Sequence, residues 1–160
     1  MNQDQGAAVE VRSADERDEW EASWYRERLA DPLLVAAGVV VVVDRLGYLA
    51  VPVGGERRGG YISVSDAAAV MPLRQALDGR DGFPALRVRW STCPSACHVV
   101  EWGEPAPETD DHEALGRVYG YSDAAVREFA DQHPPPPSGP AVTERRPSRL
   151  GRRASSSRRA

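Results

Sequence analysis

The chain has 160 residues, a hydrophobic fraction of 41% and a formal net charge of −4 at pH 7. This is enough for one domain with a hydrophobic core, with or without tails. The longest apolar run, five valines at residues 39–43, is far shorter than the about 18 residues that a membrane span needs, which excludes such a span. The chain begins without the pattern of a signal peptide, so its two cysteines are predicted to be free thiols in the cytoplasm.

The first predicted helix follows a polar leader. Residues 1–14 lack a periodic pattern, and we expect them to be disordered. A helix is predicted over residues 15–30, where Trp20 and Trp24 lie one turn apart. Asp31 precedes a proline and therefore avoids the α region, which ends the helix.

Three strands are predicted next. Residues 38–44 form a β-branched run, residues 45–47 a tight turn, and residues 48–53 the partner strand. The loop 54–60 has seven residues, four of them glycine, and residues 61–65 form the third strand. Short links between the strands imply antiparallel pairing.

A helix and a hairpin follow. The helix covers residues 65–78, with Ser65 as its N-cap and Gly79 just beyond its end. Residues 83–91 alternate between apolar and polar side chains, and residues 97–102 return as the partner strand.

Two short helices are predicted at residues 112–120 and 123–132, with Ser122 capping the second. The order of elements is helix, three strands, helix, two strands, two helices. We therefore predict a single α+β domain over residues 15–133, in which helices cover one face of an antiparallel sheet of about five strands.

Residues 134–160 form a basic tail. They hold seven arginines and one acidic residue, which gives them +6 and leaves −10 for the rest of the chain. A composition rich in Pro, Ser and Arg predicts disorder. Spaced arginines bind phosphates without sequence preference, so nucleic acid or another polyanion is the predicted partner of the tail. The arginines concerned are Arg145, Arg146, Arg149, Arg152, Arg153, Arg158 and Arg159.

Both cysteines lie at the predicted hairpin tip. Cys93 and Cys97 have a spacing that suits a disulfide or two ligands of one zinc ion, with His112 as the third ligand. A structural zinc site needs a fourth ligand, for which Asp110 or Asp111 is the candidate. Two ordinary thiols at a turn, with no cofactor, is the interpretation that we favour.

The glycine-rich loop is a second candidate site. Its backbone N–H groups would form a nest for a phosphate or carboxylate, with Arg57 and Arg58 adding positive charge. His98 or Glu101 would then transfer protons, provided that all four residues converge on one pocket. The favoured interpretation is simpler, namely a flexible hairpin loop with solvated arginines.

Acidic side chains crowd between residues 101 and 113. Such oxygens suit magnesium, but the spacing is irregular, so a solvated loop is the favoured interpretation. We also expect this segment to attract the basic tail or the Arg57–Arg58 loop. Its members are Glu101, Glu104, Glu108, Asp110, Asp111 and Glu113.

Three pieces of the sequence, "AVPVGG", "CHVVEWGE" and "LGRVYGYSDAAV", are distinctive together. The region that holds them, residues 29–132, resembles a family of small actinobacterial proteins of unknown function. The resemblance implies a bacterial, cytoplasmic origin and brings no established activity, cofactor or site residue.

The sequence offers no clear catalytic constellation, which favours a non-enzymatic binding or accessory protein. Its folded surface would meet a protein partner, and its tail would meet an anionic one. The two alternatives are a small-ligand-binding or enzymatic domain, built on the glycine-rich loop and the "CHVVEWGE" strand, and a zinc-stapled domain.

Overall fold

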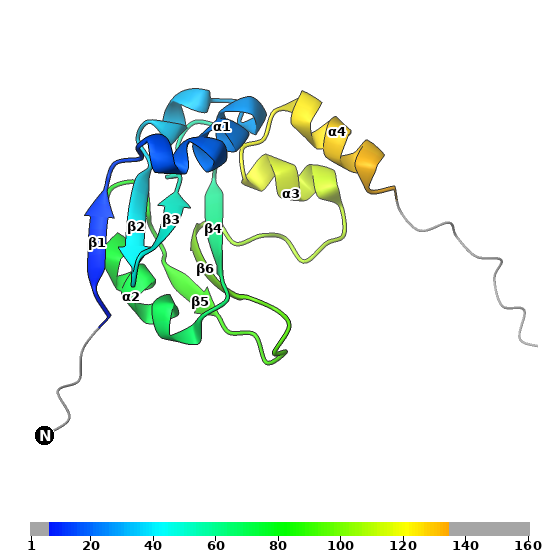
Figure 1. Ribbon diagram of the computed structural model, residues 1–160. Helices are drawn as coiled ribbons and strands as arrows, with labels where there is room; N and C mark the ends of the chain where they lie inside the picture. Colours follow the sequence, from blue (N-terminus) through cyan, green and yellow to red (C-terminus); the bar gives the residue numbers. More distant parts are fainter. Residues whose placement is uncertain (1–6, 135–160) are drawn as a thin grey trace, which may run out of the picture.

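Two three-stranded antiparallel sheets take the place of the single five-stranded sheet that the sequence predicts (Figure 1). The computed structural model describes residues 7–134, and within them the fold is α+β as predicted. The strands are β1 (Val9–Arg12), β2 (Val39–Val43), β3 (Leu46–Ala50), β4 (Gly59–Val64), β5 (Arg87–Arg89) and β6 (His98–Gly103). The helices are α1 (Glu19–Arg28), α2 (Ala67–Leu77), α3 (His112–Val118) and α4 (Asp123–Gln132), with 3-10 helices η1 (Glu16–Asp18) and η2 (Pro32–Val35). The predicted disorder of the basic tail and of residues 1–6 lies outside the described residues.

The first sheet has the order β1-β2-β3. β2 and β3 form the predicted hairpin, but its turn is tighter than expected and is centred on Asp44 and Arg45, with φ of 46° and 75°. Positive φ at both central residues matches the twist of the strands they join. β1 lies in the leader that we expected to be disordered, and that expectation is wrong for these residues. A strand of four residues is too short to show a clear alternation of apolar and polar side chains in the sequence.

The second sheet has the order β4-β6-β5, so β4, the third strand that the sequence predicts, pairs with β6 and not with β3. This pairing is why the prediction of one sheet is wrong. Sequence neighbours usually pair, but here the residues between β3 and β4 carry the chain into a new sheet.

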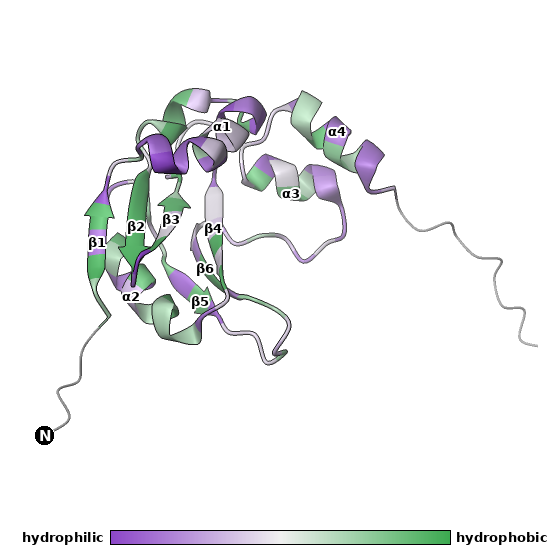
Figure 2. Ribbon diagram, viewed as in Figure 1, coloured by the Kyte–Doolittle hydropathy of each residue, from purple (hydrophilic) through white to green (hydrophobic). Residues whose placement is uncertain are grey.

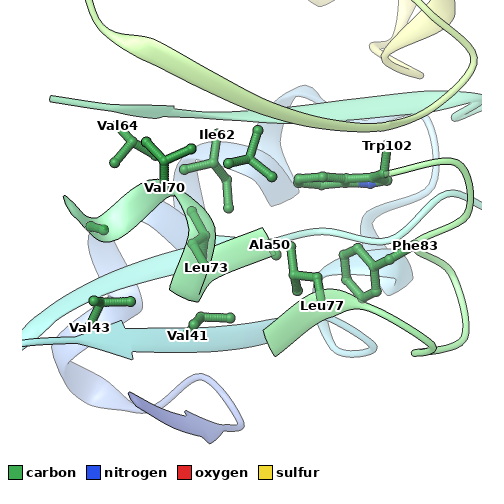
Figure 3. Close-up of a cluster of buried hydrophobic side chains, with 12 residues drawn as sticks. Val41, Val43, Ala50, Ile62, Val64, Val70, Leu73, Leu77, Phe83 and Trp102 are labelled. Carbon is green, nitrogen blue, oxygen red and sulfur yellow. The ribbon is translucent and has the colours of Figure 1, made fainter. Parts of the chain in front are cut away.

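α2 packs against the inner faces of both sheets, which Figure 3 shows from the side. Val70, Leu73 and Leu77 of this helix are fully buried. They lie between Val41 of β2 and Trp102 of β6. The helix begins one residue later than expected, since the N-cap is Asp66, whose Oδ1 accepts a 2.9 Å bond from the N–H of Ala68.

A second, smaller core lies on the other face of the first sheet, where α1 and η2 cover it. It joins Ala22 and Leu29 to Val40 and Leu49, all at least 96% buried. The helices therefore cover more than the one face that the sequence predicts.

α3 and α4 form a hairpin beside α1, away from the first sheet (Figure 1). α4 has the predicted bounds and the predicted cap, since Ser122 Oγ accepts a 3.2 Å bond from the N–H of Ala125. None of its side chains is fully buried, and Figure 2 shows apolar and hydrophilic residues alternating along it. No helix among residues 7–134 is long and apolar enough to cross a membrane.

Candidate functional site

The structure does not bring the four residues of the glycine-rich-loop hypothesis together. In the β4–β6 ladder, Val64 lies opposite His98 and Gly59 opposite Gly103. Arg57 and Arg58 precede Gly59, so they lie at the other end of the sheet from His98, about 17 Å away at the rise of a strand.

Glu101 and His98 are engaged locally. The carboxylate of Glu101 forms ion pairs with Arg87 Nε at 3.0 Å and with Arg89 Nη2 at 3.8 Å. His98 Nδ1 accepts a 3.0 Å bond from the N–H of Ser91, and its ring stands edge-on to Trp90. These contacts hold the base of the β5–β6 hairpin.

Arg57 is buried, which contradicts the expectation of a solvated arginine. Only 3% of its surface is exposed. Its Nη1 donates a 2.6 Å bond to the carbonyl of Tyr119, and its Nε a 3.3 Å bond to the carbonyl of Val51. No carboxylate among residues 7–134 pairs with it, and burial lowers the pKa of its guanidinium. Arg58 is exposed and pairs with Glu104 at 2.9 Å, which confirms that the acidic segment attracts this loop.

The cysteines lie at the hairpin tip, as predicted, and both are exposed. Cys93 Sγ lies 3.1 Å from Ser95 Oγ. His112 starts α3, and its ring packs edge-on against Phe129 of α4. In the described part of the chain, no three His, Cys, Asp or Glu side chains are grouped to hold a metal ion, so the proposed zinc ligands are not assembled there.

Five aromatic rings form a ladder from α1 to β4. The centroids of Tyr25 and Trp24 are 5.1 Å apart, and those of Trp24 and Tyr121 are 6.0 Å apart. Tyr121 lies 6.3 Å from Tyr119, which lies 5.0 Å from Tyr61. Three of these pairs are edge-to-face, and the last is tilted, which are favourable arrangements for packed aromatic rings.

Backbone contacts fix the ladder. Gly120 separates its two central tyrosines and has a φ of 72°. The carbonyl of Gly120 accepts a 2.9 Å bond from the N–H of Ala30, and the N–H of Ser122 donates a 2.8 Å bond to the carbonyl of Arg28. The connection between α3 and α4 is thereby tied to the end of α1.

An apolar groove of about 290 Å³ follows this ladder, and we call it the aromatic groove. Four rings of the ladder line it, and α4 contributes Phe129, which is 46% exposed. Arg28 also lines it and already places its guanidinium carbon 4.5 Å from the ring centroid of Trp24. The four ladder residues are Trp24, Tyr61, Tyr119 and Tyr121.

Two further hollows adjoin the aromatic groove and carry charge. A hollow of about 660 Å³ shares Tyr61 and Tyr119 with it and also contains Arg89, Glu101 and Glu108. A second hollow, of about 940 Å³ between α3 and α4, shares His112 and Val126 with the groove. The acidic residues that line this second hollow are Asp110, Asp111, Glu113 and Asp123.

Three of the four tyrosines of the ladder stay neutral phenols well above physiological pH. Burial raises the pKa of Tyr25, Tyr119 and Tyr121 above the ordinary value. Neutral rings keep their hydroxyl donors and add no negative charge of their own. Such rings can offer a ligand packing, ring-face attraction and hydrogen bonding.

No pattern in the sequence predicts the ladder. Its tyrosines come from three separate places in the chain, and no periodicity joins them. A usable signal was present, since "YGY" at residues 119–121 places two of the chain's five tyrosines around a glycine.

The fold and groove together describe a small α+β domain with an aromatic groove on its surface. The chain belongs to DUF6302, a family of unknown function whose model matches residues 13–149. This match confirms the resemblance to such a family and covers more of the chain than residues 29–132. The actinobacterial origin stays a prediction from the sequence. No curated protein and no solved structure matches the chain.

Proposed function

We propose that this chain is a non-enzymatic binding protein whose aromatic groove holds an arginine-bearing segment of a partner protein. The observation that carries the proposal is the ladder of rings along an open groove. Apolar clefts lined by rings, with a few polar groups at their edges, are the usual form of binding sites.

Ring faces and carboxylates together favour a guanidinium ligand. A guanidinium is attracted to the faces of Trp and Tyr, by about 0.5–1 kcal/mol at exposed sites and more where water is excluded. Arg28 on Trp24 is an example of this contact within the groove. The neighbouring segment supplies the complementary charge, because residues 104–134 hold eight acidic residues and two arginines, a net charge of −6.

Isothermal titration with three short peptides tests the proposal. The probes are (Gly-Arg)4, (Gly-Lys)4 and (Gly-Cit)4, in which the uncharged citrulline replaces each arginine of the first peptide. The protein is the full chain with glutamine at its tail arginines, so that these do not compete with the probe; we call it the seven-glutamine variant. Its substitutions are R145Q, R146Q, R149Q, R152Q, R153Q, R158Q and R159Q.

The arginine peptide is expected to bind more tightly than the lysine peptide, and the citrulline peptide hardly at all. Tyr61→Ser or Phe129→Ser, added to the seven-glutamine variant, should weaken arginine binding about fivefold, the equivalent of one cation–π contact. Trp90→Ser is the matched control, because Trp90 is a 52% exposed ring outside the groove. Equal affinity for arginine and lysine peptides, unchanged by the groove substitutions, would show unspecific charge attraction and contradict the proposal.

The enzymatic alternative receives no support from the positions of Arg57, His98 and Glu101, which do not converge. The prediction that the basic tail binds a polyanion concerns residues outside the described part of the chain and stays a prediction from the sequence.

A further inference from the structure

The chain itself carries a segment with the chemistry that the aromatic groove would select. We infer that residues 143–160 of the same chain occupy the groove and its acidic rim in the free protein. This inference rests on the proposed function, because it names the occupant of the same groove.

Charge complementarity is the first argument. Residues 134–160 have a net charge of +6, whereas residues 104–134 have −6. Most of the acidic side chains of this region have no cationic partner within residues 7–134, since the ion pairs there engage only Glu104, with Arg58, and Glu113, with Arg117. The remaining six are Glu108, Asp110, Asp111, Asp123, Glu128 and Asp131.

The point at which the described chain ends is the second argument. Pro134 lines the hollow between α3 and α4, together with Asp110 and Asp123. That hollow adjoins the aromatic groove at His112 and Val126. The segment that follows Pro134 therefore starts at the rim of the proposed site.

Chain length is the third argument. Arg145 lies eleven residues beyond Pro134, so it reaches at most about 40 Å from it. α4 has ten residues and is about 15 Å long, so the first tail arginines can reach along the whole of this wall of the groove. Tethering of this kind gives effective concentrations on the order of millimolar, which makes even weak contacts populated.

The occupant is an arginine side chain stacked on exposed rings. Phe129, at 46% exposure, and Tyr61, at 39%, are the two most accessible rings of the groove. A guanidinium over Phe129 lies close to rim carboxylates, because Phe129 packs on His112, which follows Asp111 and precedes Glu113 in the chain. Stacking and ion pairing then act on one side chain.

Paramagnetic relaxation in the full chain tests this inference. A nitroxide is attached at Ser148→Cys in a Cys93→Ser, Cys97→Ser background. Amide signals of α3 and α4 are expected to lose more than half of their intensity, while those of β1 keep theirs. The same label in the seven-glutamine variant should leave the α3 and α4 signals intact. Broadening centred elsewhere, or unchanged by the glutamines, would overturn the inference.

A mixed sample identifies which chain supplies the segment. In this sample the spin label and the ¹⁵N label are on different molecules, so the broadening should vanish. Broadening that persists would assign the contact to a second copy of the chain and would contradict occupancy within one chain.

Titration with (Gly-Arg)4 separates this inference from the proposed function. If its own segment fills the groove, the unsubstituted chain should bind the peptide at least about tenfold more weakly than the seven-glutamine variant. Equal affinities would refute self-occupancy and leave the proposed function intact. No binding to the seven-glutamine variant would refute both.

Discussion

Arg57 and Tyr119 are joined by a 2.6 Å hydrogen bond from the guanidinium to a backbone carbonyl, across 62 positions of the sequence. The same guanidinium reaches the carbonyl of Val51 and lies 5.8 Å from the ring centroid of Tyr25. One buried side chain thus links the residue that follows β3, helix α1 and the connection between α3 and α4. Through its bond to Tyr119, Arg57 also helps to position a residue that lines the aromatic groove.

Replacing Arg57 should therefore destabilise the fold. Arg57→Ala leaves two carbonyls without their donor and opens a cavity, which costs about 2–4 kcal/mol. Arg58→Ala is the matched control, because this neighbour pairs with Glu104 at the surface and its loss costs less than about 1 kcal/mol. Urea unfolding of the two variants measures both losses in the free energy of unfolding. Similar midpoints would show that Arg57 does not join these elements.

Gly120→Ala tests the close approach behind the groove. A Cβ at this position would lie 2.5 Å from Cβ and 2.7 Å from Cα of Arg57, and φ is 72°. Backbone atoms cannot move aside easily, so we expect a loss of more than about 2 kcal/mol. Gly79→Ala is the control, because φ there is 71° but no atom lies within 4 Å, and the backbone term alone costs about 1 kcal/mol. Equal losses in the two variants would contradict the steric argument.

The elements that the sequence predicts well are those with a local cause. α4 has the predicted bounds because Ser122 is a strong cap, and β2 follows from its run of valines. β1 and the division into two sheets depend on pairing between distant strands, which side-chain patterns do not encode.

The candidate site shows the same limit. Arg57 looked solvated because its neighbours are Glu56, Arg58 and glycines, a composition typical of surface loops. In the folded chain it instead lies against the carbonyl of Tyr119 and the ring of Tyr25, which are far from it in the sequence. The segment 101–113 was correctly expected to attract the Arg57–Arg58 loop, because that prediction needed only opposite charge.

Two carboxyl groups near α1 should affect acid stability in opposite directions. The hydrogen bond from Arg12, at 2.6 Å, lowers the pKa of Asp18, whereas burial raises the pKa of Glu21. A lowered pKa contributes stability that is complete above the unfolded value of about 3.9 and is lost as the pH falls through the folded pKa. A raised pKa has the opposite sign, since the buried charge is unfavourable at neutral pH and protonation relieves it.

Asp18→Asn should accordingly lower stability at pH 7, and its difference from the unsubstituted chain should shrink as the pH falls towards 2. Glu21→Gln should raise stability at pH 7. Urea midpoints measured between pH 2 and 7 show both trends. A difference for Asp18→Asn that does not change with pH would mean that the ion pair with Arg12 contributes nothing.

Cys93 should react faster than Cys97 with an alkylating reagent. The hydroxyl of Ser95, 3.1 Å from Sγ, together with backbone N–H groups, lowers the pKa of the Cys93 thiol, and this raises the fraction of reactive thiolate. Both thiols are exposed, so access does not separate them. Ser95→Ala should reduce the rate at Cys93 about two- to fivefold near neutral pH and leave Cys97 unchanged, as measured by mass spectrometry after timed iodoacetamide treatment. Equal slowing at both cysteines would instead indicate that the whole hairpin tip had changed, and the hydrogen bond would not be the cause.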